Sequence, residues 1–132
     1  MVLIVEDEAI SRKALQQLLR LSGLETRAAG SAEEAIGMML QDGPPELALV
    51  DINLPGMNGV EFVAELHRHY PNLPCVFMTA NDDALTAQIR SACPEPTFRK
   101  PFDVSSLLRL ISSRINVNRL HASLGHCGTL EN

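Results

Sequence analysis

The chain has 132 residues, of which 45% are hydrophobic and 20% are charged, so its composition is that of one globular domain and not of a disordered segment. The net charge of −5 argues against a sequence-independent grip on nucleic-acid phosphates. No apolar run approaches the roughly 20 residues of a membrane-spanning helix, and the first residues lack the basic segment of a secretory signal.

The first segment pairs a short apolar run with a helical pattern. Residues 2–5 are all apolar, which predicts a buried strand, and the acids Glu6, Asp7 and Glu8 follow at once. The next segment repeats apolar residues at helical spacing and stops near Gly23. These apolar residues are Ile10, Ala14, Leu15, Leu18, Leu19 and Leu21.

The second segment repeats this order. Residues 24–29 predict a weak strand, and Ser31 begins a capping-box sequence that predicts the start of a helix. A stripe of apolar residues follows at helical spacing, and residues 43–45 end the helix with Gly-Pro-Pro. The stripe consists of Ala32, Ala35, Ile36, Met39 and Leu40.

The third segment carries the most informative pattern. Residues 47–50 form an apolar run that leads into Asp51 and then into a Pro-Gly turn, which predicts a strand buried on both faces and ending in a carboxylate. Asn58 can cap the next helix, with Glu61 three residues later, and Pro71 ends it. We expect four side chains of this helix to face inward: Phe62, Val63, Leu66 and Tyr70.

The last two segments are shorter. Residues 75–80 predict a buried strand with Thr79 near its end, and residues 81–91 predict a helix. Residues 97–100 predict a strand that ends in Lys100. Asp103 can cap the final helix, whose apolar stripe is Val104, Leu107, Leu108, Ile111 and Ile115.

This alternation of five strands with five helices predicts an α/β fold with a doubly wound parallel sheet. We expect one domain over residues 1–116 and a flexible, solvated tail over residues 117–132. With the strand order 2-1-3-4-5, the first and third strands are neighbours, and Glu6, Asp7 and Asp51 meet at the topological switch point, where open α/β sheets bind ligands.

Three carboxylates at one place repel one another and favour a cation, and Mg²⁺ fits because it binds few carboxylates together with water and phosphate oxygens. A carboxylate beside Mg²⁺ can attack phosphorus, which makes Asp51 the candidate phosphoryl acceptor. Lys100 and Thr79 can hold the outer phosphoryl oxygens.

Each of these residues also has a structural explanation. Asp51 can be a turn residue, Glu6 and Asp7 can favour the N-terminus of the following helix, Thr79 can bond to backbone, and Lys100 can be a solvated surface residue. The functional hypothesis depends on all of them falling at strand ends in this order. The cysteines Cys75, Cys93 and Cys127 form no C-x-x-C pair, which is typical of a reducing cytoplasm without disulfides.

Over about residues 2–116 the chain resembles a response-regulator receiver domain. Four motifs, specific only in combination, carry this resemblance: Val-Glu6-Asp7-Glu, Asp51-Ile-Asn-Leu-Pro-Gly-Met-Asn-Gly59, Met-Thr79-Ala80 and Lys100-Pro101-Phe102. The resemblance implies a five-stranded flavodoxin-like fold. It also implies a cytoplasmic protein that is not an enzyme acting on other substrates, but a phosphoacceptor promoting its own Mg²⁺-dependent phosphorylation and dephosphorylation.

The resemblance also implies roles and partners. Asp51 would receive a phosphoryl group from a sensor histidine kinase or a histidine phosphotransfer protein. Asp7, Asp51 and the backbone carbonyl of Asn53 would bind Mg²⁺, with Glu6 acting mainly through water. Thr79 and Lys100 would hold the phosphoryl group, and its presence would change binding to a downstream protein target. No direct binding to nucleic acid and no membrane association are expected, and dimerisation is left open.

The chain departs from the family where the phosphorylated state is usually read out. The family's aromatic residue three positions before the lysine is Thr97 here, and the neighbouring Phe98 should face the opposite way. The usual Ala-Gly-Ala is replaced by Ala-Cys-Pro at residues 92–94, and Pro96 follows, so this segment is stiffer and has fewer donors. The usual readout through the fourth helix and fifth strand is therefore in question: the small Thr97 could leave room for another side chain, or the domain could signal through a different face.

Three other functions compete with this one. A haloacid-dehalogenase-type phosphatase also uses an aspartate and Mg²⁺, but it needs an acid two residues after the nucleophile, where this chain has Asn53. A nucleotide-binding domain needs a glycine-rich phosphate loop after the first strand, and none is present. The stronger alternative is a module with the same fold that binds partners without being phosphorylated, and only the Thr97 region favours it.

Overall fold

The computed structural model describes residues 1–80, 95–100 and 103–127. The chain divides into two compact units, Met1–Phe102 and Asp103–Asn132, and each is described by itself. The helix expected over residues 81–91 and the altered segment at residues 92–94 lie outside the described residues. In the part of the chain that is described, no helix combines the length and the hydrophobicity needed to cross a membrane.

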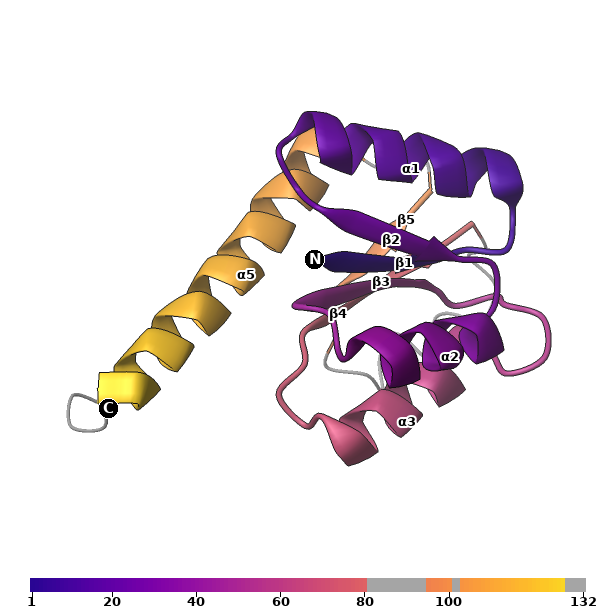
Figure 1. The fold of residues 1–132 in the computed structure, drawn as a ribbon. Coiled ribbons are helices and arrows are strands. Elements are labelled where there is room, and N and C mark those ends of the chain that lie inside the picture. The colour runs from indigo at the N-terminus through magenta and orange to yellow at the C-terminus, as the bar shows by residue number, and fades with distance from the viewer. Residues whose placement is uncertain (81–94, 101–102, 128–132) are drawn as a thin grey trace. The chain divides into compact units, whose positions relative to one another are not determined.

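A parallel five-stranded sheet forms the centre of the first unit (Figure 1). The strands lie side by side in the order β2-β1-β3-β4-β5, as expected. Each apolar run that the sequence shows forms a strand of this sheet. In chain order they are β1 (Val2–Val5), β2 (Thr26–Ala29), β3 (Leu47–Asp51), β4 (Cys75–Thr79) and β5 (Thr97–Arg99). The prediction of an α/β, flavodoxin-like fold is therefore confirmed.

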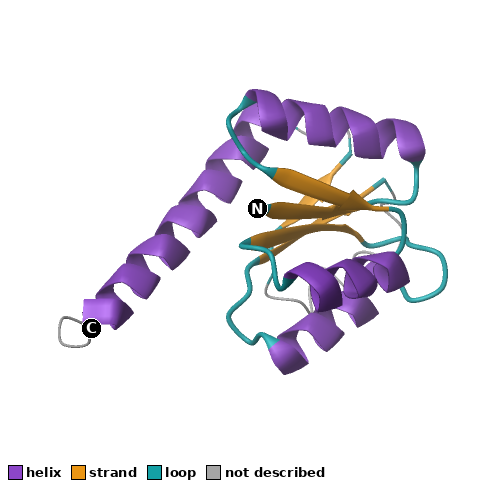
Figure 2. Cartoon of the chain, viewed as in Figure 1, coloured by secondary structure: helices purple, strands orange, loops and turns teal. Residues whose placement is uncertain are grey.

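Within the described residues of this unit, three helices cover the sheet. Helix α1 (Ala9–Leu21) lies on one face, and α2 (Ala32–Asp42) and α3 (Gly59–His69) lie on the other (Figures 1 and 2). Asn58 and Glu61 cap α3 with the expected capping box. At α2, the Ser31 hydroxyl accepts from the Glu34 backbone N–H, but the Glu34 carboxylate accepts from Gly30.

The core lies along both faces of the sheet, because every residue of β1, β3 and β4 is buried. Among the apolar residues of α1, Leu15 and Leu19 are buried, whereas Ile10 and Leu21 are 77% and 78% exposed. The prediction that Tyr70 faces inward is wrong, because it is the C-cap of α3, where the backbone has left the helix, and it is 36% exposed.

In residues 103–127, the described part of the second unit, the chain forms helix α5 (Val104–Cys127). Asp103 precedes it and accepts hydrogen bonds from the Ser105 backbone N–H and the Ser106 hydroxyl, as expected of a capping residue. Three members of its apolar stripe are buried, namely Leu107, Ile111 and Ile115. The helix continues beyond residue 116, and the domain boundary and the flexibility of residues 117–132 stay predictions.

Candidate functional site

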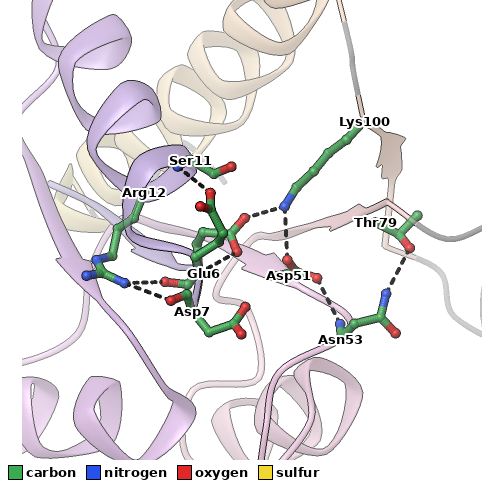
Figure 3. A network of polar contacts seen from close by, with 9 residues as sticks. Glu6, Asp7, Ser11, Arg12, Asp51, Asn53, Thr79 and Lys100 are labelled. Carbon is green, nitrogen blue, oxygen red and sulfur yellow. Dashed lines mark hydrogen bonds and ion pairs between the residues drawn. The ribbon is translucent and has the colours of Figure 1, made fainter.

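Three carboxylates gather at the carboxyl edge of the sheet. Glu6 and Asp7 follow β1, and Asp51 is the last residue of β3, the neighbour of β1. One oxygen from each of them lies within 4.8 Å of the others. Glu6 and Asp51 are only 1% and 5% exposed, whereas Asp7 is exposed. The expected meeting of these acids at the switch point is therefore present in the structure (Figure 3).

Lys100 directly follows β5, and its ammonium group lies within this acidic cluster. Its Nζ atom donates a hydrogen bond to Asp51 Oδ2 at 3.0 Å and a second, short one to Glu6 Oε1 (Figure 3). The Lys100 backbone N–H donates to the Thr79 carbonyl at 2.7 Å, which fixes where the side chain begins. One cation thus bridges two buried carboxylates that belong to different strands.

Burial and hydrogen bonding have opposite effects on the pKa values of Glu6 and Lys100. Burial raises the pKa of Glu6, and the nearby Asp51 carboxylate raises it further, although the hydrogen bond from Lys100 opposes both effects. Burial alone would lower the pKa of Lys100, but its hydrogen bonds to Glu6 and Asp51 outweigh that effect and raise the pKa. Lys100 is therefore a firmly charged cation within the acidic cluster.

Asn53 connects the carboxyl ends of β3 and β4. Its backbone N–H donates to Asp51 Oδ1 at 2.8 Å, and its side-chain amide donates to the Thr79 hydroxyl at 3.2 Å. Thr79 is fully buried at the end of β4. All six residues that the sequence singled out, Glu6, Asp7, Asp51, Asn53, Thr79 and Lys100, thus lie around one place (Figure 3).

Helix α3 begins directly against the backbone of the candidate acceptor. A Cβ atom on Gly59 would lie 2.2 Å from the Asp51 carbonyl oxygen, which is far inside van der Waals contact. The connecting turn also needs Gly56, whose φ of 69° belongs to the left-handed region. These two glycines let the chain reverse within a few residues and hold Asp51 at the edge of the sheet.

Strand β5 confirms the expected orientation at the altered position. Thr97 pairs with Phe77 and is two residues from the partner of Thr79, so Thr97 and Thr79 share one face of the sheet. Phe98 points to the other face by alternation. A threonine therefore occupies the position beside Thr79 where an aromatic side chain was expected from the resemblance.

One further residue at the site was not identified from the sequence. Arg12 on α1 donates hydrogen bonds to the backbone carbonyls of Glu6 and Asp7 (Figure 3). A basic residue one turn into a helix is common, and no local pattern shows that its side chain turns back toward the preceding loop. Only the spacing of five and six residues from the acids could have indicated it.

The donors fit a hard divalent cation. Carboxylate oxygens from two strands converge within 4.8 Å, and such oxygens are the ligands that Mg²⁺ prefers. One of them, on Asp7, is exposed to solvent, which leaves room for the water ligands that Mg²⁺ retains. The Lys100 ammonium group bonds to both Asp51 and Glu6, where it can stabilise an anion.

Comparisons with known proteins agree with this geometry. The family described as response regulator receiver domain matches residues 2–112. The response regulator protein FleR of Pseudomonas aeruginosa is 36% identical over 114 residues, covering 84% of this chain and 24% of that protein. The DNA-binding transcriptional regulator NtrC of Klebsiella pneumoniae is 32% identical over 116 residues, covering 86% of this chain and 24% of that protein.

Solved structures give the same family. The crystal structure of the receiver domain of NtrX from Brucella abortus superimposes with a TM-score of 0.76 at 26% identity, covering 88% of this chain and 98% of that one. The chain itself spans only about a quarter of the length of the two relatives named above. By its sequence, its fold and the acids at its sheet edge, the chain belongs to the family of response regulator receiver domains, which act in two-component systems.

Proposed function

We propose that this receiver domain is a phosphoacceptor and that Asp51 receives the phosphoryl group. The observation that carries the proposal is the position of its carboxylate, which lies within 4.8 Å of two other acids and 3.0 Å from the Lys100 ammonium group. The donor is a sensor histidine kinase or a histidine phosphotransfer protein. The phosphorylated form then binds a downstream protein target differently.

The transfer step requires an in-line attack on phosphorus. An Asp51 carboxylate oxygen forms the new bond to phosphorus, while the bond from phosphorus to the donor's imidazole nitrogen breaks and its electrons leave with that nitrogen. Lys100 then moves its hydrogen bond from Asp51 Oδ2 to a phosphoryl oxygen. The Thr79 hydroxyl donates a hydrogen bond to another phosphoryl oxygen, and its oxygen can at the same time keep the hydrogen bond that it accepts from the Asn53 amide.

Mg²⁺, held by Asp7, Asp51 and the Asn53 carbonyl with Glu6 acting through water, would neutralise the charge that builds up on the phosphoryl oxygens. The chain's own contribution is to keep those ligands crowded before the ion arrives. Burial of Glu6 and Asp51 and the tether from the Asn53 N–H to Asp51 provide this order.

We place the protein in the cytoplasm, where histidine-kinase donors act. We also propose that the chain makes no direct contact with nucleic acid, because its net charge of −5 disfavours phosphate binding. The name of NtrC calls it a DNA-binding protein, but that name describes the whole protein, of which this chain covers 24%.

The decisive experiment is intact mass spectrometry after incubation with acetyl phosphate and Mg²⁺. We expect the wild type to gain the mass of one phosphoryl group as acetate leaves, and we expect Asp51→Asn to gain none. Omitting Mg²⁺ should abolish the gain. Because the Asn side chain keeps the size of Asp51, loss of the adduct reports on the acceptor and not on misfolding.

A different result would change the proposed function. Phosphorylation of Asp51→Asn would place the acceptor elsewhere. Absence of any adduct on the wild type, with both acetyl phosphate and a histidine-phosphorylated donor, would favour a module that binds partners in its unmodified form. The presence of Thr97 on the face of Thr79 is the observation that favours this second function.

A further inference from the structure

We propose that Arg12 is a positioning residue for the magnesium site and that it sets the affinity of the acidic cluster for Mg²⁺. The inference rests on the proposed function, because it concerns the same acids. It differs from that function in assigning a role to a residue that contacts neither a carboxylate nor the phosphoryl group. Arg12 acts instead through the backbone of the loop that carries Glu6 and Asp7.

The guanidinium group holds two consecutive carbonyls. Arg12 Nη1 donates to the Glu6 carbonyl oxygen at 2.9 Å and to the Asp7 carbonyl oxygen at 3.3 Å (Figure 3). Side chains of a helix lean toward its N-terminus, so a residue in the first turn of α1 reaches the loop that precedes it. The Arg12 side chain thus holds the two peptide groups whose carbonyls belong to Glu6 and Asp7.

Asp7 is the acid that depends most on this support. The Glu6 carboxylate accepts from the Glu8 backbone N–H and from Lys100, and the Asp51 carboxylate accepts from the Asn53 N–H and from Lys100. Among the described residues, no hydrogen bond or ion pair holds the Asp7 carboxylate, which is also exposed. Its direction is therefore set by its backbone, and Arg12 holds that backbone at the carbonyl.

The position of the guanidinium group is itself restricted. Gly30 follows β2, and a Cβ atom there would lie 3.2 Å from Arg12 Nη1. The Gly30 backbone N–H is held by the Glu34 carboxylate at 2.7 Å, so this wall cannot move away easily. Arg12 therefore lies in a niche made by the end of one strand and the start of α2, and its orientation is fixed before a metal ion binds.

The type of contact also matters for charge. Lys100 binds the carboxylate oxygens themselves, whereas both hydrogen bonds of Arg12 go to carbonyl oxygens. Arg12 therefore orders the acidic loop and leaves the ligand oxygens of Asp7 available. Residues that orient metal ligands in this way commonly change metal affinity by about 10- to 100-fold when they are removed.

The test measures the dissociation constant for Mg²⁺ by two-dimensional NMR titration on the wild type, Arg12→Ala, Arg12→Lys and Lys13→Ala. Lys13→Ala is the matched control, because it removes the same charge from the next residue of α1, for which the structure gives no contact with the acids. We expect about tenfold weaker binding for Arg12→Ala. Lys13→Ala should remain within about twofold of the wild type, since exposed charges are largely screened.

Two additional variants address geometry and folding. Arg12→Lys keeps the charge, but its side chain is one bond shorter than the one that places Nη1 between the two carbonyls, so its affinity should lie between those of Arg12→Ala and the wild type. Gly30→Ala keeps Arg12 and its charge but pushes the guanidinium group aside, so it should weaken Mg²⁺ binding about threefold, below the full effect of removal. If Arg12→Ala does not fold, the Mg²⁺ affinity of Gly30→Ala tests the role of Arg12 instead.

A kinetic measurement separates positioning from general damage. Phosphorylation by acetyl phosphate is followed as a function of Mg²⁺ concentration. For Arg12→Ala the half-saturating Mg²⁺ concentration should rise by the same tenfold factor, while the rate at saturating Mg²⁺ should remain close to that of the wild type. A lower saturating rate with unchanged half-saturation would overturn the proposal.

The remaining outcomes also decide the question. Equal Mg²⁺ affinity in the wild type and Arg12→Ala, or an equal loss in Lys13→Ala, would overturn the role of Arg12 and leave the phosphoacceptor function intact. Failure of the wild type itself to bind Mg²⁺ would overturn both proposals. Loss of phosphorylation with normal Mg²⁺ binding in the wild type would overturn the proposed function alone.

Discussion

At the scale of single residues, the site is a balance of like charges held by one cation. Glu6, Asp7 and Asp51 bring three carboxylates within 4.8 Å, and Lys100 neutralises part of that charge by bonding to the two buried ones. Two unit charges 4 Å apart repel by about 1 kcal/mol in water and by about 4 kcal/mol near a protein surface. In the metal-free protein, the Lys100 ammonium group therefore offsets the repulsion between Glu6 and Asp51.

The first prediction concerns this cation. Lys100→Met keeps the aliphatic stem and removes the ammonium group, which leaves two buried carboxylates with their backbone donors but without a cation. We expect the free energy of unfolding in metal-free buffer to fall by about 2 kcal/mol, less than for a fully buried pair because the Lys100 side chain is 21% exposed. Urea unfolding with and without Mg²⁺ measures this, and Mg²⁺ should restore more stability to the variant than to the wild type.

The second prediction concerns pH and the start of α1. Glu8 is the N-cap of this helix, and its hydrogen bond from the Ser11 backbone N–H lowers its pKa below the ordinary 4.5. A lowered pKa in the folded state means that ionised Glu8 adds stability above the ordinary value and that this contribution is lost as the pH falls through the lowered pKa.

Glu8→Gln should therefore be less stable than the wild type at pH 7, because the amide accepts a hydrogen bond but lacks the charge that favours a helix N-terminus. Below the lowered pKa the two proteins should have equal stability. Thermal melts across the acidic range provide the measurement. A stability difference that does not depend on pH would show that the charge of Glu8 has no part in the cap.

At the scale of elements, the helices differ in how much of their apolar surface the sheet covers. Helix α1 buries Leu15 and Leu19 against β1 and β2, but leaves Ile10 and Leu21 mostly exposed. Helix α3 approaches the sheet at one point of backbone contact, because Gly59 brings its first turn against the Asp51 backbone. The end of β3, which carries the candidate acceptor Asp51, thus packs directly against the backbone of α3.

The third prediction compares two apolar residues of α1. Leu19→Ala should lower the free energy of unfolding by about 2–5 kcal/mol, because it opens a cavity in the core. Ile10→Ala on the same helix should change it by no more than about 0.5 kcal/mol, because Ile10 is 77% exposed. Urea denaturation of both variants tests this, and an equal loss would mean that Ile10 is covered in the folded protein.

At the scale of the whole molecule, metal binding and folding are linked through the acids. They come from β1 and β3, which are far apart in the sequence and adjacent in the sheet, so the cluster exists only in the folded chain. A ligand that binds only the folded state stabilises it by mass action, which amounts to about 2.7 kcal/mol at a hundredfold excess over its dissociation constant.

The fourth prediction follows from this linkage. Asp51→Asn removes one of the repelling charges and keeps one of the two oxygens that accept from Lys100 and Asn53. The relieved repulsion should outweigh the lost hydrogen bond, so the variant should melt at a higher temperature than the wild type without Mg²⁺, by about 1 kcal/mol in stability. Mg²⁺ should then stabilise the wild type much more than the variant. Melting curves of the wild type that do not change with Mg²⁺ would contradict the metal site.

The sequence alone determined the order of elements and the chemistry of the site. Apolar runs that end in Glu6, Asp51 or Thr79, and a short mixed run that ends in Lys100, identify both the strands and their carboxyl ends, because a buried strand leaves polar groups only at its edge. Capping residues such as Asn58 were visible for the same local reason. These features depend on short-range spacing, which the sequence displays directly.

Tertiary structure decided which groups contact each other. The bridge from Lys100 to Glu6 and Asp51, the bond between Asn53 and Thr79, and the niche of Arg12 join strands and helices that are distant in the sequence. Helical spacing also could not reveal which side of α1 the sheet covers, nor that Tyr70 leaves the helix at its cap. Such contacts depend on how the elements pack around the sheet, and local spacing carries no information about that packing.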